Sequence, residues 1–327
     1  MVKLIMSLAA LALLEVTLVA AYLPADYQTR SAAQKQTILW NQIILEPYST
    51  LPTGGHGLLA MARLLAPTYH TTAFNRVSDE LEDGRVKLLH PYGSCAKAEL
   101  RINAASPYTG VLKANSVGTA VIRPSVAAWD EIGAGLKPGL GVKVLINGGP
   151  SVNFHTLFNT DGNGPNNNNF FLNPVANTFV QPDPSPATYL IVKAMELALK
   201  LLAGGAEARP VGVNLLGLTE QTAVEVDGTV VPVNAVRAPF KLTWIPNPAF
   251  QVAPESTLDF RRQIERVPSG STVYTLTAFA TQADADSNNG VPIGELVTTS
   301  EFVTTKYCDD NLYLQHARRP WRAFGQS

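Results

Sequence analysis

The stretch that decides the fold lies between residues 86 and 180, where four short runs read VKLL (86–89), CAKAELRI (95–102), GTAVI (118–122) and VKVLI (142–146). Each run is rich in apolar residues and is bounded by Gly, Pro, Asn or Ser, which is typical of β-strands. Further strand-like runs follow at 211–218, 222–233, 240–244, 273–280 and 296–304. Together they predict one α+β domain with a β-barrel or a strongly curved sheet.

Two longer helices are expected beside these strands, in addition to a short helix over 55–65 that ends before Pro67. Ser31 followed by Gln34 is a capping-box pattern, and it opens a helix that runs to about Ile44. Ser185, with a proline after it, is a favourable N-cap for a second helix over 187–203.

Composition narrows the classes of function. The chain has 327 residues, of which 46% are hydrophobic, and a net charge of -1. This is enough apolar material for a sizeable core. The charge balance gives no electrostatic footprint for a nucleic-acid partner.

The N-terminus has the pattern of a secretory signal peptide. Lys3 precedes a short apolar stretch at 4–14, and small residues at 19–21 resemble a cleavage site. We therefore expect a secreted, extracellular protein with no stable membrane span, and oligomeric state stays open. The expected division is a signal peptide at 1–21 and a single domain at 22–327, with a helical arm at 22–84, a barrel at 85–316 and a short C-terminal tail.

The chain contains two cysteines, Cys95 and Cys308. In a secreted protein an even pair can form a disulfide, whereas a small buried thiol is equally compatible with the strand that contains Cys95. The sequence leaves both alternatives open.

Short polar sites interrupt the strand-rich region in a fixed order. They are His90 in the segment HPYG, Arg123 and Ser125 in the segment RPS, and Asn153 in the segment PSVNF. A histidine, a serine and an asparagine delivered from separate apolar strands predict one constructed pocket. A lone histidine at a strand end is more often structural, so the hypothesis depends on the whole set.

The order and spacing of these sites resemble the haem catalase superfamily. The resemblance implies a catalase-like antiparallel β-barrel with a few flanking helices, haem b as cofactor, and hydrogen peroxide or an organic (fatty-acid) hydroperoxide as substrate. By the same resemblance His90 is the catalytic acid and base, Ser125 supports its imidazole, and Asn153 orients the peroxide. Arg123 would bind a haem propionate, and Lys87 replaces an arginine that the family has three residues before the histidine.

One family element departs from this pattern. The superfamily binds the haem iron through a tyrosine in the pattern Arg-x-x-x-Tyr, which is absent from this sequence. Tyr307, Tyr313 and His316 are the candidate substitutes, although each is also compatible with a structural role. The departure keeps open whether the chain is an enzyme, and it motivates the alternative of a haem-free binding or structural protein on a degenerate catalase scaffold.

A weaker pattern lies near residue 290. Positions 1, 3, 5 and 12 of an EF-hand-like spacing are occupied by Asp284, Asp286, Asn288 and Glu295. The glycine of that motif is one place late, at Gly290, and the flanks are strand-like. We therefore expect a hairpin turn through Asn289 and Gly290 rather than a calcium site.

Overall fold

The computed structural model describes residues 23–45, 47, 92–126, 138–156, 176–179, 222–232, 235, 237–250, 261–310, 312 and 314. The expected signal peptide, the strands at 86–89 and 211–218, and the helix at 187–203 lie outside these residues. Within the described part of the chain, no helix combines the length and the apolar character needed to cross a membrane.

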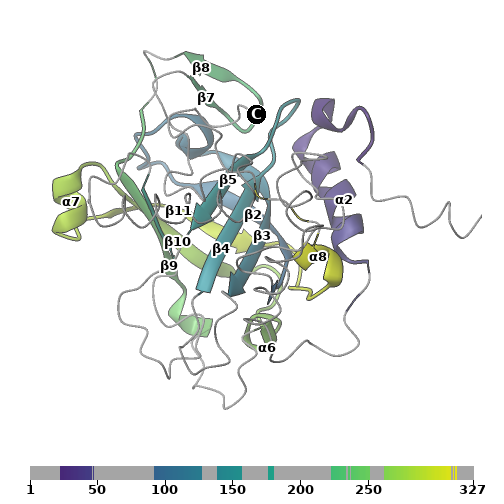
Figure 1. The fold of residues 1–327 in the computed structure, drawn as a ribbon. Helices are drawn as coiled ribbons and strands as arrows, with labels where there is room; N and C mark the ends of the chain where they lie inside the picture. Colours follow the sequence, from purple (N-terminus) through teal and green to yellow (C-terminus); the bar gives the residue numbers. More distant parts are fainter. Residues whose placement is uncertain are drawn as a thin grey trace, which may run out of the picture.

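A curled antiparallel sheet forms the centre of the described structure (Figure 1). Its strand order is β5-β4-β3-β2-β11-β10-β9-β6, and the short β1 also pairs with β3. Its strands are β1 (Tyr92–Gly93), β2 (Ala96–Ile102), β3 (Val117–Val126), β4 (Pro138–Val144), β5 (Val152–Thr156), β6 (Ala176–Phe179), β9 (Lys241–Pro246), β10 (Thr272–Phe279) and β11 (Val291–Thr298). A separate pair consists of β7 (Thr222–Val224) and β8 (Val230–Pro232). The expected α+β class with a strongly curved sheet is thus confirmed as a half-barrel.

The concave side of the sheet encloses the main apolar core. Alternate residues of the strands point inward, so that Phe154 of β5, Trp244 of β9 and Tyr274 of β10 meet inside the curl. The ring centroids of Phe154 and Trp244 are 5.7 Å apart, and those of Trp244 and Tyr274 are 6.5 Å apart, both edge-on. Complete burial raises the pKa of the Tyr274 hydroxyl well above its usual value.

Helix α2 (Ala32–Ile43) covers the convex side of the sheet. It begins with the predicted capping box: the Ser31 side chain accepts from the Gln34 amide, and the Gln34 side chain accepts from the Ser31 amide. Lys35 in its first turns is fully buried and donates hydrogen bonds to the Ile146 and Gly149 carbonyls. The helix is therefore anchored to the turn between β4 and β5.

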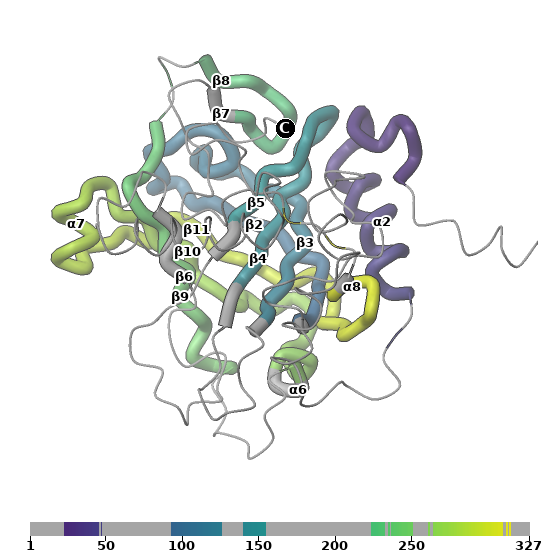
Figure 2. The backbone as a smooth tube through the Cα atoms, in the orientation of Figure 1, coloured from purple at the N-terminus to yellow at the C-terminus, as the bar shows by residue number. Residues whose placement is uncertain are grey.

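Short helices complete the fold. In the described part of the chain they are α6 (Arg261–Ile264), α7 (Gln282–Asp286), α8 (Lys306–Asp310) and 3-10 turns at Tyr27–Thr29, Gly110–Leu112 and Pro248–Phe250. Helix α8 lies beside the C-terminal end of α2, where the yellow and purple parts of the tube meet in Figure 2. The Thr305 hydroxyl, just before α8, donates to the Ile43 carbonyl.

Strands β10 and β11 form the expected antiparallel hairpin, but the expected tight turn at Asn289 and Gly290 is wrong, because the connection contains helix α7. Thr281 and Asp284 form a second capping box at its start. The Asp284 carboxylate accepts from the Thr281 amide at 3.0 Å and from its hydroxyl at 2.7 Å. Among the described residues, no three potential metal-binding side chains gather.

Candidate functional site: a buried polar face

Strand alternation places Arg123, Ser125 and Asn153 on the same, convex face of the sheet. In β3, Ala120 and Ile122 belong to the concave core, whereas Val121 packs with α2 and α8, so residues 123 and 125 share the side of Val121. In β5 the neighbours of Asn153 also face the concave core. All three polar side chains are buried. The structure thus brings three of the predicted site residues to one covered face.

The strand register sets the spacing on this face. Ser125 pairs with Gly139 and Asn153 pairs with Lys143, so β4 separates them and they are offset by four residues along it. With strands ~4.8 Å apart and a rise of ~3.3 Å per residue, their Cα atoms are about 16 Å apart. Ser125 and Asn153 therefore cannot both contact one small peroxide.

Asn153 belongs to a small polar network. The Ser151 hydroxyl accepts from the buried Lys143 ammonium at 3.0 Å and lies 3.5 Å from the Asn153 amide nitrogen, which donates to it. The Asn153 amide oxygen is buried and has no hydrogen-bond partner among the described residues. The network orients the amide so that its oxygen is an available acceptor.

Arg123 forms a buried ion pair that the sequence did not predict. Its guanidinium donates to Asp309 Oδ1 at 2.8 Å, and the side chains of both residues are almost completely buried. The Gly93 amide donates to the same oxygen at 2.7 Å. The pairing balances the charge of Arg123, and it depends on residues 186 positions apart, so that no local motif reports it.

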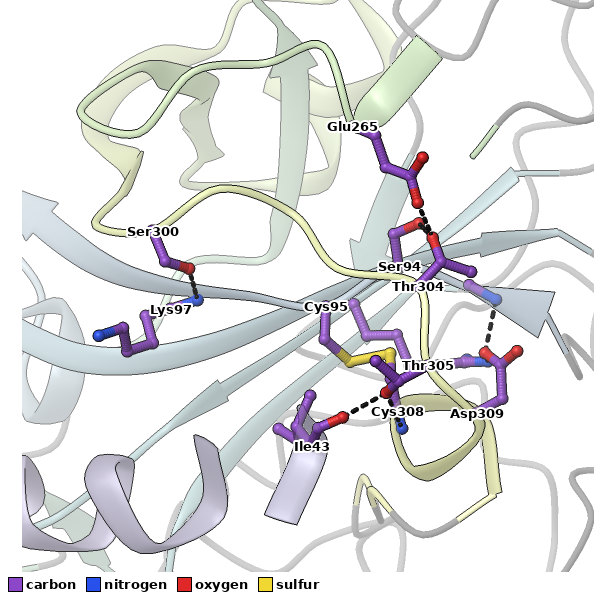
Figure 3. Close-up of a disulfide and its surroundings, with 12 residues drawn as sticks. Ile43, Ser94, Cys95, Lys97, Glu265, Ser300, Thr304, Thr305, Cys308 and Asp309 are labelled. Carbon is purple, nitrogen blue, oxygen red and sulfur yellow. Dashed lines mark hydrogen bonds and ion pairs between the residues drawn. A yellow bond between two sulfur atoms is a disulfide. The ribbon is translucent and has the colours of Figure 1, made fainter. Parts of the chain in front are cut away.

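Helix α8 is held against this face by several links (Figure 3). Cys95 and Cys308 form a disulfide with a Cα–Cα distance of 5.9 Å, which settles the alternative left open by the sequence. Beside it, the Ser94 and Thr304 hydroxyls are 2.8 Å apart. The Thr305 hydroxyl also accepts from the Cys308 amide at 3.0 Å and so caps the first turn of α8. These links fix the position of Asp309.

An apolar side chain lies between the polar positions. Gly141 of β4 pairs with Arg123 on one side and with His155 on the other. A Cβ atom at Gly141 would lie only 1.9 Å from Leu314 Cδ1, so the Leu314 side chain occupies the space directly over this glycine. The middle of the face is therefore packed at this point.

Other predicted site residues fall outside the described part of the chain. These are His90, Lys87, Tyr313 and His316. Their proposed roles as acid and base, propionate partner and axial ligand stay predictions. The convergence of His90 with Ser125 is likewise untested.

Comparison of the chain with models of known protein families finds no match, and a search of curated proteins finds no similar sequence. The resemblance to haem catalases therefore rests on the quoted residues alone.

Proposed function

We propose that this chain is a secreted, catalase-like haem protein that acts on hydrogen peroxide or on organic hydroperoxides. The observation that carries the proposal is the common burial of Arg123, Ser125 and Asn153 on one face of the sheet, with the Asn153 amide oxygen lacking a described partner. A buried acceptor without a partner is costly, and it fits a site that receives an O–H donor from a ligand.

The described residues are compatible with the edge of a haem group. Arg123 holds the Asp309 carboxylate, and its planar fork of five N–H donors would bind a propionate carboxylate in exchange for that of Asp309. When bound, haem would supply the iron redox chemistry of peroxide turnover.

In this proposal the protein residues bind, orient and move protons. Asn153 would accept the O–H of the peroxide through its amide oxygen and so fix its direction. His90 would carry a proton from one peroxide oxygen to the other. The Cα atoms of Ser125 and Asn153 are about 16 Å apart, so Ser125 would act on the His90 imidazole rather than on the peroxide.

Secretion is part of the proposal. A disulfide between buried cysteines supports it, because such bonds persist mainly in oxidising compartments. Expression of the full chain with its N-terminus intact, followed by sequencing of protein recovered from the medium, tests it. We expect the exported chain to begin near Tyr22, and retention of the uncleaved chain in the cell would contradict secretion.

Haem titration of the purified chain tests the central claim. We expect a Soret band that saturates at one haem per chain and peroxide consumption that depends on it. Asn153→Ala should retain haem and lose most of the peroxide turnover, whereas the exposed Asn289→Ala serves as a matched control and should change neither. A folded protein that takes up no haem would refute the proposal.

A second candidate is a haem-free binding or structural protein on the same scaffold. It is favoured by Leu314, which fills the space over Gly141, and by the engagement of Arg123 with Asp309. Its expected signature is a cooperative unfolding transition that is unchanged by added haem. A shift of that transition to higher temperature with haem would exclude this candidate.

A further inference from the structure

The Arg123–Asp309 contact has two sides of different origin. The donors come from the sheet: the Arg123 guanidinium from β3 and the Gly93 amide from β1, which pairs with β3 through Ser125. The acceptor comes from α8, a separate short helix attached through Cys308. The sheet therefore builds a receptor for a carboxylate, and a different segment supplies the carboxylate.

Glycine at position 93 makes this receptor possible. A Cβ atom there would lie 2.9 Å from the Arg123 guanidinium carbon and 2.6 Å from the Pro124 carbonyl oxygen. Any side chain would therefore displace the guanidinium from the amide that shares its ligand. Two donors, one charged and one from the backbone, meet one oxygen at 2.8 and 2.7 Å in a buried position, and such charge-assisted bonds are strong.

We propose that the Arg123 guanidinium and the Gly93 amide form a carboxylate-binding site, which the chain closes with its own Asp309 and which a small free carboxylate enters when that side chain is removed. The inference does not require haem. Removal of one partner from a buried ion pair is strongly destabilising, so an anion of matching shape that replaces the Asp309 carboxylate should bind favourably.

Chemical rescue with formate tests the site. Asp309→Ala keeps the Cβ atom and removes the carboxylate, so formate replaces the missing group. We expect the variant to melt at a lower temperature than the parent chain and sodium formate to raise that temperature in a saturable way. At ten times its dissociation constant, formate should raise the ratio of folded to unfolded protein about elevenfold.

Size and charge provide the controls. Sodium chloride at equal ionic strength should have no comparable effect. Asp309→Gly should prefer acetate over formate, because acetate also replaces the missing carbon. The double variant Arg123→Met/Asp309→Ala should respond to neither anion, and the parent chain should not respond because Asp309 fills its site.

The inference is overturned if chloride stabilises Asp309→Ala as well as formate does, or if the double variant responds equally. If Asp309→Ala does not fold in buffer, its refolding yield in formate against chloride measures the same binding, and equal yields would also overturn it.

A haem-binding experiment connects the carboxylate site to the proposed function, and its expected result rests on that function. If a propionate uses Arg123, it competes with Asp309, and Asp309→Ala should bind haem more tightly than the parent chain. Absence of haem binding in both proteins with intact formate rescue would reject the haem proposal alone. Failure of formate rescue with haem binding intact would reject the carboxylate site alone.

Discussion

Removal of the Cys95–Cys308 disulfide is expected to lower the free energy of unfolding by about 5 kcal/mol. The bond joins residues 213 positions apart, and the chain-entropy relation gives about 5 kcal/mol for closing a loop of that size in the unfolded chain. For a domain of this size the loss corresponds to a fall in Tm of roughly 10–20 °C. Residual structure in the unfolded chain reduces the effect, so this value is an upper estimate.

The assay compares urea and thermal unfolding of the parent chain with Cys95→Ala/Cys308→Ala. A dithiol reductant provides the control: it should lower the stability of the parent chain after a cycle of unfolding, since both cysteines are buried, and should leave the double variant unchanged. If the free energy of unfolding of the double variant lies within about 1 kcal/mol of that of the oxidised parent, the bond does not constrain the unfolded chain to the expected extent.

Three further changes test the packing. Because burial raises the Tyr274 pKa, the folded chain keeps a proton that the unfolded chain releases, so stability is complete below pH 10.0 and falls as pH rises above it. In Tyr274→Phe the free energy of unfolding should lose this dependence on pH, which is up to about 1.4 kcal/mol per pH unit in urea titrations. The same pH dependence in the variant and the parent chain would contradict the assignment. Gly141→Ala should cost about 1–3 kcal/mol by collision with Leu314, and adding Leu314→Ala should restore part of the loss; an unchanged single variant would show that the space is open. Ser31→Ala should cost about 1 kcal/mol by circular dichroism melting while Ser31→Thr stays close to the parent, and equal stability of all three would rule out the cap as a stabilising contact.

Elements with local signals could be predicted from the sequence. The run at 95–102 became β2 at Ala96–Ile102, and the Ser31 capping box opened α2 as expected. The cap of α2 is a contact within three residues of the signal, whereas β2 was indicated by its own residue types although its partners are β3 and the distant β11.

The predicted boundaries of strands were wrong where pairing with distant strands outweighed the local sequence preference. The strand expected at 296–304 is β11 at Val291–Thr298. It begins five residues earlier because Pro292 and Gly294, which normally disfavour strands, pair with β10 and β2. The strand expected at 142–146 likewise begins four residues earlier, because β4 at Pro138–Val144 pairs with β3 along its whole length.

Helix α7 has a local signal in the sequence, because Thr281 and Asp284 have the spacing of a capping box. Asp284 also fits the first position of the calcium-like spacing, and this second pattern conceals the first. Asp309 is different, because its partner Arg123 is 186 residues away and nothing near either residue indicates the pair. The strand positions of the candidate site could thus be predicted from the sequence. The Asp309 carboxylate within the site could not.

The order in which a ribosome releases these residues adds a constraint on how the protein matures. Asp309 emerges 186 residues after Arg123, which at ordinary elongation rates is a delay of ~10–40 s. Throughout that interval the nascent β3 lacks the Asp309 carboxylate that Arg123 contacts in the folded chain, and α2 lacks the Thr305 hydroxyl that contacts its last turn. The convex layer therefore assembles only after the segment with Thr305 and Asp309 has been synthesised, long after β3 and α2.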